Sequence, residues 1–500
     1  MKRIASLIFV IVAISSCVDL DEELYDRLPK DIYPENEIQG ALITGPIYEP
    51  LREFLDGGGW WFCQEVPSDE LVFPTRHTDW DDGGKWRVLH QHTWTNTTEA
   101  INSMWSRYYQ GIGEANQLLE QLGEATDEAG AATIAKIKIM RAYYYYLLID
   151  NYGDVPYVTS FSTAEEQPSA TPRAVIWESI VEEVQESIPA LTESTSKNAV
   201  TRGMAYSLLA KLYLNAEVYT GTQDNDYWVE AQAACDFIID SLNYTLESDP
   251  LAPFITENQN SPENIFTIPY DEDTYQGFNL HMRTLHYQHN LTFDMTAGPW
   301  NGCAATYDFY KSYEDGDIRK ENGFLVGPQQ TINGAQIFDE VAGTNLNINP
   351  ELPALVMDLS YTYEQIRMSG ARVSKFEIAT GAKANLSNDF PLFRLADIFL
   401  MRAEAQMKQN GWVPDSKSLE LVNEIRSRAN VDEWSTGELT ETSLLAERGR
   451  EMFFEGHRRQ DLIHFGEFND AWWEKDASSE DRNTFPIPQW VLDANPNLSN

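Results

Sequence analysis

Residues 77–95, HTDWDDGGKWRVLHQHTWT, combine three histidines, three aspartates and three tryptophans around a Gly83-Gly84 turn. The whole chain contains only eight histidines. Imidazole and carboxylate groups can ligate a metal ion or transfer protons, whereas tryptophan rings offer a rigid apolar surface to a ligand. The stretch could therefore form a metal site, a catalytic site or an aromatic ligand-binding surface. The rest of the sequence indicates which of these is favoured.

A metal site has weak support. His90 and His92 would point to the same side of a strand, but a zinc site needs further ligands from elsewhere in the chain. Asp79, Asp81 and Asp82 suit calcium better, because Ca²⁺ takes hard oxygen ligands. Since no EF-hand loop occurs in the sequence, we predict no cofactor and no functional metal. A structural calcium ion with irregular ligand geometry remains an alternative.

Catalysis has no sequence signature in this chain. The Gly-x-Ser-x-Gly, His-Glu-x-x-His, Walker and dinucleotide-binding motifs are all absent from the sequence. Carboxylate pairs are abundant in so acidic a chain, but sequence spacing cannot place two of them at the separation that glycoside hydrolysis requires. We predict that the protein is not an enzyme, with a secreted glycoside hydrolase as the alternative.

An aromatic ligand-binding surface is the interpretation that the composition favours. The chain has 14 tryptophans and 24 tyrosines, and the C–H face of a sugar ring packs on such rings while its hydroxyls need Asp, Asn or Arg. Trp80 and Trp86 flank the turn and are expected at the surface, whereas Trp94 is expected to be buried. Trp60-Trp61, after three glycines, is either a mobile aromatic tip or a hydrophobic plug.

Further candidates lie outside the opening stretch. Trp300-Asn301-Gly302-Cys303 pairs a stacking ring with an amide and two small residues that let a ligand approach the backbone. Arginine and aspartate candidates could bind hydroxyls, or could form structural ion pairs instead. The predicted ligand-binding residues are Asp69, Arg76, Trp80, Trp86, Tyr275, Tyr287, Trp300, Asn301, Cys303 and Arg372.

The first residues predict export and a lipid anchor. Lys2 and Arg3 precede an apolar run over residues 4–14, followed by Ser15-Ser16-Cys17. The run is too short for a membrane span, which needs about 20 residues. The small residues before Cys17 resemble a bacterial lipoprotein cleavage site, so we predict that Cys17 becomes the lipid-carrying first residue. The acidic stretch that follows looks like an export tag of surface lipoproteins.

The net charge and the cysteine content exclude several classes of protein. The formal charge is −42, and loss of residues 1–16 with their two basic residues makes it −44. Nucleic acid is excluded as a partner, because phosphate binding needs a basic stripe. The three cysteines left after Cys17 form no Cys-x-x-Cys motif and indicate neither a disulfide framework nor a structural zinc site.

Helical periodicity dominates both ends of the chain. The patterns predict helices at 100–122, 134–149, 173–190, 201–220, 227–242, 391–409, 416–428 and 442–465, with Thr201 as an N-cap. Small residues within these helices suggest stacked helix pairs of tetratricopeptide type, although no clean repeat is visible. We divide the chain into a signal peptide at 1–16, a helical part with an aromatic loop segment at 17–245, a loop-rich ligand-binding portion at 246–390 and closing helices at 391–500.

A carboxylate stripe marks the predicted helix at 442–465. Glu447, Glu451 and Glu455 follow one another at four-residue steps, with several arginines nearby. Such a stripe could bind a metal ion or act as acid and base. The interleaved arginines favour ion pairs on the helix surface and between helices, and His457 is expected to be packed or hydrogen-bonded.

Five blocks of the sequence resemble one family in the expected order. The blocks are RAYYYYLLIDNYGDVPYV, PENIFTIPY, FPLFRLADIFLMRAEA, ERGREMFFEGHRRQDLIHFGEF and FPIPQWVLDANPNLSN. Together with the lipoprotein start they look like SusD/RagB-type outer-membrane nutrient-binding lipoproteins. The resemblance implies a mainly α-helical fold, in which tetratricopeptide-like helix pairs carry an irregular ligand-binding portion.

The resemblance also implies a function. Such a protein would bind an oligosaccharide or polysaccharide at the cell surface, and would deliver it to a SusC-like TonB-dependent transporter in the outer membrane. A non-glycan nutrient such as peptide is the alternative within the binding class. A helical-repeat scaffold without a small ligand is a third interpretation, in which Trp80, Trp86 and Trp300 would contact no saccharide.

Overall fold

The structure is a computed structural model that describes residues 37–192 and 196–498. Cys17 and the signal peptide lie outside the described residues. Within these ranges no helix is both long and apolar enough to cross a membrane.

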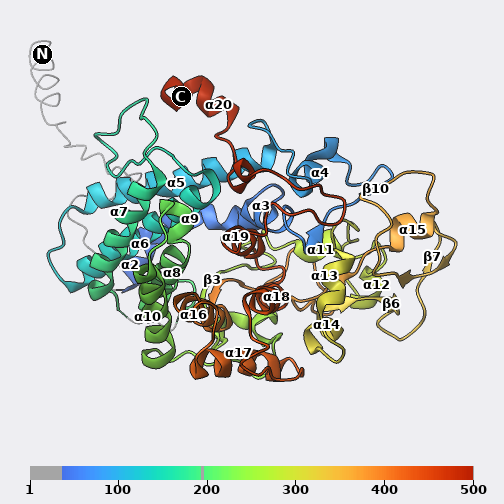
Figure 1. The fold of residues 1–500 in the computed structure, drawn as a ribbon. Helices are drawn as coiled ribbons and strands as arrows, with labels where there is room; N and C mark the ends of the chain where they lie inside the picture. The colour runs from blue at the N-terminus through green and yellow to red at the C-terminus, as the bar shows by residue number, and fades with distance from the viewer. Residues whose placement is uncertain (1–36, 193–195, 499–500) are drawn as a thin grey trace, which may run out of the picture.

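Helices of the amino-terminal half stack side by side at one end of the molecule (Figure 1). The long ones are α5 (Glu99–Leu122), α6 (Glu128–Tyr152), α7 (Arg173–Ser187), α8 (Arg202–Leu214) and α10 (Asn225–Ser241). Successive helices pack as neighbours, α5 on α6, α6 on α7 and α8 on α10. The helix-pair scaffold predicted from the sequence is therefore confirmed.

Residue types explain why these helices form and pack closely. Asp127 and Thr201 cap α6 and α8 by accepting a hydrogen bond from a backbone N–H of the first turn. A Cβ atom at Gly111 of α5 would lie 2.2 Å from the ring of Tyr144 in α6, so only glycine permits this approach. Helix α6 buries nearly its whole circumference between neighbours, as its two apolar faces predict.

The carboxy-terminal helices complete the scaffold. Helix α16 (Leu395–Gln409) packs on both α10 and α17 (Ser416–Arg428). Helices α18 (Glu441–Met452), α19 (Arg458–His464) and α20 (Gln489–Ala494) follow. Because α10 and α16 are neighbours, the intervening chain forms an insertion carried by the scaffold.

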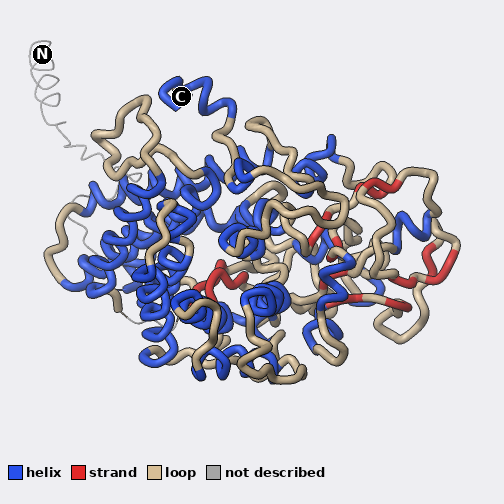
Figure 2. The backbone as a smooth tube through the Cα atoms, in the orientation of Figure 1, coloured by secondary structure: helices blue, strands red, loops and turns tan. Residues whose placement is uncertain are grey.

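This insertion consists mainly of loops with short elements (Figure 2). Its longest strand, β3 (Asn264–Ile268), pairs antiparallel with β12 (Phe390–Arg394) beside α16. Loops dominate the end of the molecule farthest from α5 to α10. The other helices of the insertion are α11 (Leu280–Thr284), α12 (Asn290–Phe293), α13 (Tyr307–Ser312), α14 (Ile318–Gly323) and α15 (Tyr363–Met368).

Three sequence predictions about elements are wrong. Residues 391–394 belong to strand β12, and the helix begins only at Leu395. The helix predicted over 442–465 is broken after Met452, where Phe454 (φ 70°) and Gly456 (φ 81°) turn the chain. His90 lies in helix α4 (Lys85–His90) instead of a strand.

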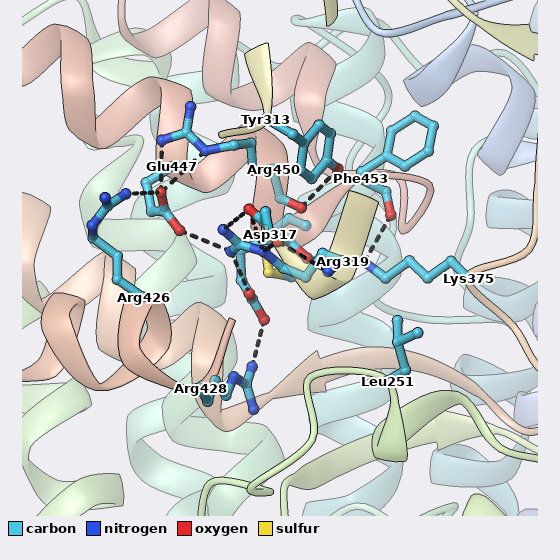
Figure 3. Close-up of polar contacts among 12 residues, drawn as sticks. Leu251, Tyr313, Asp317, Arg319, Lys375, Arg426, Arg428, Glu447, Arg450 and Phe453 are labelled. Atoms are coloured by element: carbon cyan, nitrogen blue, oxygen red, sulfur yellow. Dashed lines mark hydrogen bonds and ion pairs between the residues drawn. The ribbon is translucent and has the colours of Figure 1, made fainter. Parts of the chain in front are cut away.

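The carboxylate stripe at the break is buried instead of lying on a helix surface. Glu447 accepts hydrogen bonds from three arginines, Arg319 at 2.8 Å, Arg426 at 3.0 Å and Arg450 at 2.6 Å (Figure 3). Glu451 in turn accepts from Arg319 and Arg394 at 2.9 and 2.8 Å. The predicted ion pairs therefore exist, but they join α18 to α14, β12 and α17 in the interior of the protein.

Candidate functional site

Short strand pairings bring the opening stretch next to the Trp300 loop. Strand β1 (Leu71–Val72) pairs antiparallel with β4 (Ala304–Ala305), and β2 (Thr75–Arg76) pairs parallel with β10 (Val356–Met357). The chain leaves β2 directly into the turn that carries Trp80. Three segments far apart in sequence thus meet at one surface.

Trp80 and Trp300 are directly connected at this surface. The indole Nε1 of Trp80 donates a hydrogen bond to the backbone carbonyl of Trp300 at 2.8 Å. The Trp80 ring lies against the backbone of Gly302, where a Cβ atom would come within 2.5 Å of it. Trp300 is 38 % exposed, and Trp80 is half-buried against Phe73. The hydrogen bond therefore ties the turn that carries Trp80 to the loop that carries Trp300, and both side chains offer apolar surface there.

Tyr287 adds a third aromatic ring and polar groups. Its hydroxyl donates to the Asp79 carboxylate, next to Trp80 in sequence, and burial raises the pKa of this phenol to about 12. The Arg367 guanidinium lies 4.4 Å from the centre of the Tyr287 ring. We call Trp80, Tyr287 and Trp300 the aromatic platform. Asp79 and Arg367 supply a carboxylate and a cation at its edge.

Arg367 is itself held by a buried acid. Its Nε donates to Asp339 at 2.7 Å, and His286 Nε2 lies 3.2 Å from the same carboxylate. Burial alone would raise the pKa of Asp339, but the hydrogen bonds from His286 and Arg367 bring it well below its ordinary value. Burial lowers the pKa of His286 to about 4, so at neutral pH the anion Asp339 fixes the Arg367 side chain.

Two predicted ligand-binding arginines lie beneath the platform instead of on it. Arg372 is fully buried and donates to Asn301 Oδ1 at 2.8 Å and to the carbonyl of Ser369 at 2.7 Å. Arg76 donates to the carbonyls of Ile366 and Ser369 at 2.7 and 3.0 Å. Burial lowers the pKa of Arg76 to about 10, and it also lowers the pKa of Arg372 well below its ordinary value. Both side chains satisfy carbonyls at the end of α15 and in the turn that follows it.

The backbone of the site adopts costly conformations. Non-glycine residues with positive φ include His77 (63°), Trp80 (60°), Asp82 (40°) and Asn301 (55°). Each such residue costs about 1–3 kcal/mol and persists only where the surroundings enforce it. Arg372 holds the Asn301 amide. Arg76 donates to the Gly302 carbonyl through its side chain and to the Asp79 carbonyl through its backbone N–H, so the segments that carry Trp80 and Trp300 are held by the fold.

The other predicted ligand-binding residues lie elsewhere. Trp86 is only 3 % exposed, so the expectation that it lies at the surface is wrong; it stacks on Phe73 beneath Trp80. Asn301 and Cys303 are fully buried. Asp69 forms a bidentate ion pair with Arg458, both bonds being 2.7 Å long.

Tyr275 is not part of the platform. It lies under the Arg52 guanidinium, 4.4 Å from the ring centre, and lines a separate cavity of about 270 Å³ between α2 (Glu37–Tyr48) and β3. Trp94 is buried, as predicted. Trp60 and Trp61 begin helix α3 (Trp60–Glu65) and are buried, so they form a plug and not a mobile tip.

The histidines and aspartates of the opening stretch have separate partners. His90 and His92 are buried, with ring nitrogens 2.8 and 3.0 Å from the carbonyls of Trp473 and Pro67. The Asp81 carboxylate pairs with Arg87 at 2.7 Å, and Asp82 accepts from Trp86 Nε1 at 2.7 Å. Across 37–192 and 196–498, no group of three or more His, Cys, Asp or Glu side chains is arranged to hold a metal ion.

Sequence reasoning missed two cations at the site. Arg283, at the end of α11, lies 5.3 Å from the Trp300 ring centre and 4.8 Å from that of Phe62. Arg367 lies in α15, with nothing in its local pattern to distinguish it from a solvated helix residue. Both arginines lie in the insertion, and they come close to the site only because segments of the insertion pair with distant parts of the chain. The fold and the site thus define a helical-repeat scaffold that carries an open aromatic platform with a polar edge.

Comparison with known proteins identifies the family. The SusD family model matches residues 262–500. A second model, described as starch-binding associating with outer membrane, matches residues 68–214. The chain belongs to the SusD family, as the resemblance predicted. Membership in this family confirms the prediction that the protein is not an enzyme.

Individual relatives align with most of the chain. The Starch-binding protein SusD of Bacteroides thetaiotaomicron is 25 % identical over 485 residues, covering 87 % of this chain and 84 % of the relative. A SusD superfamily protein from Parabacteroides distasonis superposes with a TM-score of 0.77 at 21 % identity, covering 92 % of this chain and 98 % of the other. Surface glycan-binding protein A from B. thetaiotaomicron, in complex with laminarihexaose, superposes with a TM-score of 0.73 at 19 % identity. The match covers 92 % of this chain and 97 % of the other. These structures share the fold of this chain.

Proposed function

We propose that the protein binds a glycan on the aromatic platform. The observation that carries this proposal is the joint placement of Trp80, Tyr287 and Trp300 at one surface, with Asp79 and Arg367 at its edge. Sugar rings stack on such aromatic faces, and their hydroxyls take hydrogen bonds from charged groups beside them. The platform is built on a rigid buried frame, so little ordering entropy is lost on binding.

The relatives support a glycan as the ligand class. The 25 % identical relative is named a starch-binding protein, and a structural neighbour is in complex with laminarihexaose. The two names differ in glycan, so the sugar that this chain takes has to be found by experiment. A peptide is the second candidate ligand, since the same rings and charges could hold aromatic or basic side chains.

The cellular role that follows is nutrient capture at the outer membrane. We infer that Cys17 carries lipid and anchors the protein there. The outer-membrane association in the description of the matching family model supports this location. Captured glycan would then pass to a SusC-like TonB-dependent transporter. An open platform suits this role, because transfer to a partner requires release as well as capture.

Affinity electrophoresis of residues 18–500 in gels containing single polysaccharides tests the proposal. Retardation by one polymer is expected, and it should be weakened at least about tenfold in the apparent dissociation constant in Trp300→Ala and Trp80→Ala. Trp490→Ala is the matched control, because Trp490 is 51 % exposed but lies in α20, away from the platform. Equal retardation of all four proteins would contradict binding at the platform.

A further inference from the structure

A second cavity lies beside the platform, without being part of it. It has a volume of about 410 Å³ and opens between residues 53–60 and the first turns of α5. Phe54 and Trp60, whose ring centres are 5.4 Å apart, line it but are themselves buried. The volume falls within the range of small-ligand sites, about 300–1,000 Å³.

Polar groups line the mouth of this cavity. Arg107 forms an ion pair with Glu53 and donates to Gln110 at 3.0 Å, which orients its guanidinium. Asp56 is exposed at the opposite side. Ser103 adds a hydroxyl that donates to the carbonyl of Glu99 at 3.2 Å and keeps its acceptor capacity.

Glycines 57–59 give a ligand access to the backbone on one side of the cavity. A Cβ atom at Gly59 would lie 2.4 Å from the carbonyl of Glu53, and Gly58 has a φ of 103°. Glycine is therefore required at both positions by the turn itself. The same turn leaves the cavity wall free of side chains there.

Arg283 connects the cavity to the platform. A Cβ atom on Gly57, which lines the cavity, would lie 3.5 Å from the Arg283 guanidinium. The same guanidinium lies 5.3 Å from the centre of the Trp300 ring. This buried side chain lies between the two features, which are therefore close enough for one chain-like ligand to occupy both.

The charges of the cavity select among ligands. Glu53 is neutralised by Arg107, whereas Asp56 and Glu99 leave an excess of negative charge, with Lys85 3.5 Å from Glu99. A sugar carrying a carboxylate or sulfate would be repelled. A neutral sugar can place its hydroxyls on the carboxylates, on the Arg107 guanidinium and on the glycine backbone of the cavity wall.

We propose that this cavity is a second subsite, which takes a neutral sugar unit of a glycan whose neighbouring units stack on Trp300 and Trp80. This subsite rests on the proposed glycan-binding function. Its consequence is a dependence of affinity on chain length, since only a long oligosaccharide reaches from the platform across Arg283 into the cavity.

Calorimetric titration with oligosaccharides of increasing length tests the subsite. The probes are malto-, laminari-, xylo- and manno-oligosaccharides from disaccharide to heptasaccharide, with oligogalacturonates of the same lengths as anionic probes. For the neutral series that binds, affinity should rise about tenfold or more once the chain spans both features, equivalent to one or two added hydrogen bonds. Oligogalacturonates should show no such rise.

Variants separate the subsite from the platform. Ser103→Trp fills the cavity and Asp56→Ala removes a carboxylate without adding bulk; both should abolish the gain for long chains and leave short-chain affinity unchanged. Gln117→Trp, on α5 outside the cavity, is the steric control and should behave like the unmodified protein.

Each outcome of the titration bears on the subsite. A length-dependent gain that survives both Ser103→Trp and Asp56→Ala would overturn the subsite while leaving platform binding intact. A gain for oligogalacturonates that these variants remove would overturn the assignment to neutral sugars. Absence of binding by every saccharide would count against the platform and the subsite together.

Discussion

Replacing the buried carboxylate Glu447 by glutamine should destabilise the fold strongly. The carboxylate is fully buried, and its two oxygens accept hydrogen bonds from Arg319, Arg426 and Arg450 (Figure 3). Glu447→Gln leaves these guanidinium groups with one buried negative charge fewer. Removing one partner of a buried ion pair costs about 3–5 kcal/mol, because the remaining charge is left uncompensated.

The pKa of Glu447 gives an independent magnitude. Burial raises this pKa, but the three arginines outweigh burial and lower it from 4.5 to about 2. This difference in pKa corresponds to roughly 3 kcal/mol of stability at pH 7. Because the folded pKa is the lower one, this contribution is complete above pH 4.5 and is lost as the pH falls towards 2. At pH 3 less than half of this contribution should remain, roughly 1 kcal/mol.

Urea unfolding followed by circular dichroism measures this effect. The free energy of unfolding of Glu447→Gln should be lower than that of the unmodified protein by about 3–4 kcal/mol at pH 7, and the difference should shrink at pH 3. Glu420→Gln is the matched control, since Glu420 is exposed on α17 and should change stability by less than about 0.5 kcal/mol. A loss below about 1 kcal/mol at pH 7 would refute the assignment of Glu447 as a charge anchor.

Three further predictions concern other parts of the molecule. Gly302→Ala should weaken glycan binding as much as Trp80→Ala does, because its Cβ would lie 2.5 Å from the Trp80 ring; Gly298→Ala, with nothing within 4 Å, should have no effect in the same titration. Burial raises the pKa of Glu65 to about 7, so stability contributed by its neutral form falls as the pH rises from 4.5 to 7. Glu65→Gln should therefore raise the free energy of unfolding at pH 8 by up to ~3 kcal/mol, and an unchanged pH dependence would contradict this. Cys17→Ala should move the protein from the membrane to the soluble fraction of its host cells, and continued membrane association would refute lipid anchoring at this residue.

Local sequence patterns predicted the scaffold, because helix periodicity and helix caps depend on residues that are close together in the sequence. The apolar periodicity of 134–149 and the cap at Thr201 are confirmed by α6 and α8. The break at 453–457 was missed because the Glu447, Glu451 and Glu455 spacing continues through it. Only the positive φ of Phe454 and Gly456, imposed by tertiary contacts, ends the helix there.

The positions of the candidate site residues were predicted only in part, because they depend on contacts between segments far apart in the sequence. Trp80, Tyr287 and Trp300 do meet at one surface, but the sequence could not show that Arg76 and Arg372 lie beneath it. Buried loops need donors for their carbonyls, and which carbonyls lie near an arginine depends on pairings such as β2 with β10. The same long-range pairings bring Arg283 and Arg367 to the site.

A crystal structure of the protein with its tightest-binding oligosaccharide tests the central claim most directly. Sugar rings stacked on Trp80 and Trp300, with hydroxyls hydrogen-bonded to Asp79 or Arg367, are the predicted result. A saccharide bound in the separate cavity at Tyr275, with the aromatic platform empty, would contradict it.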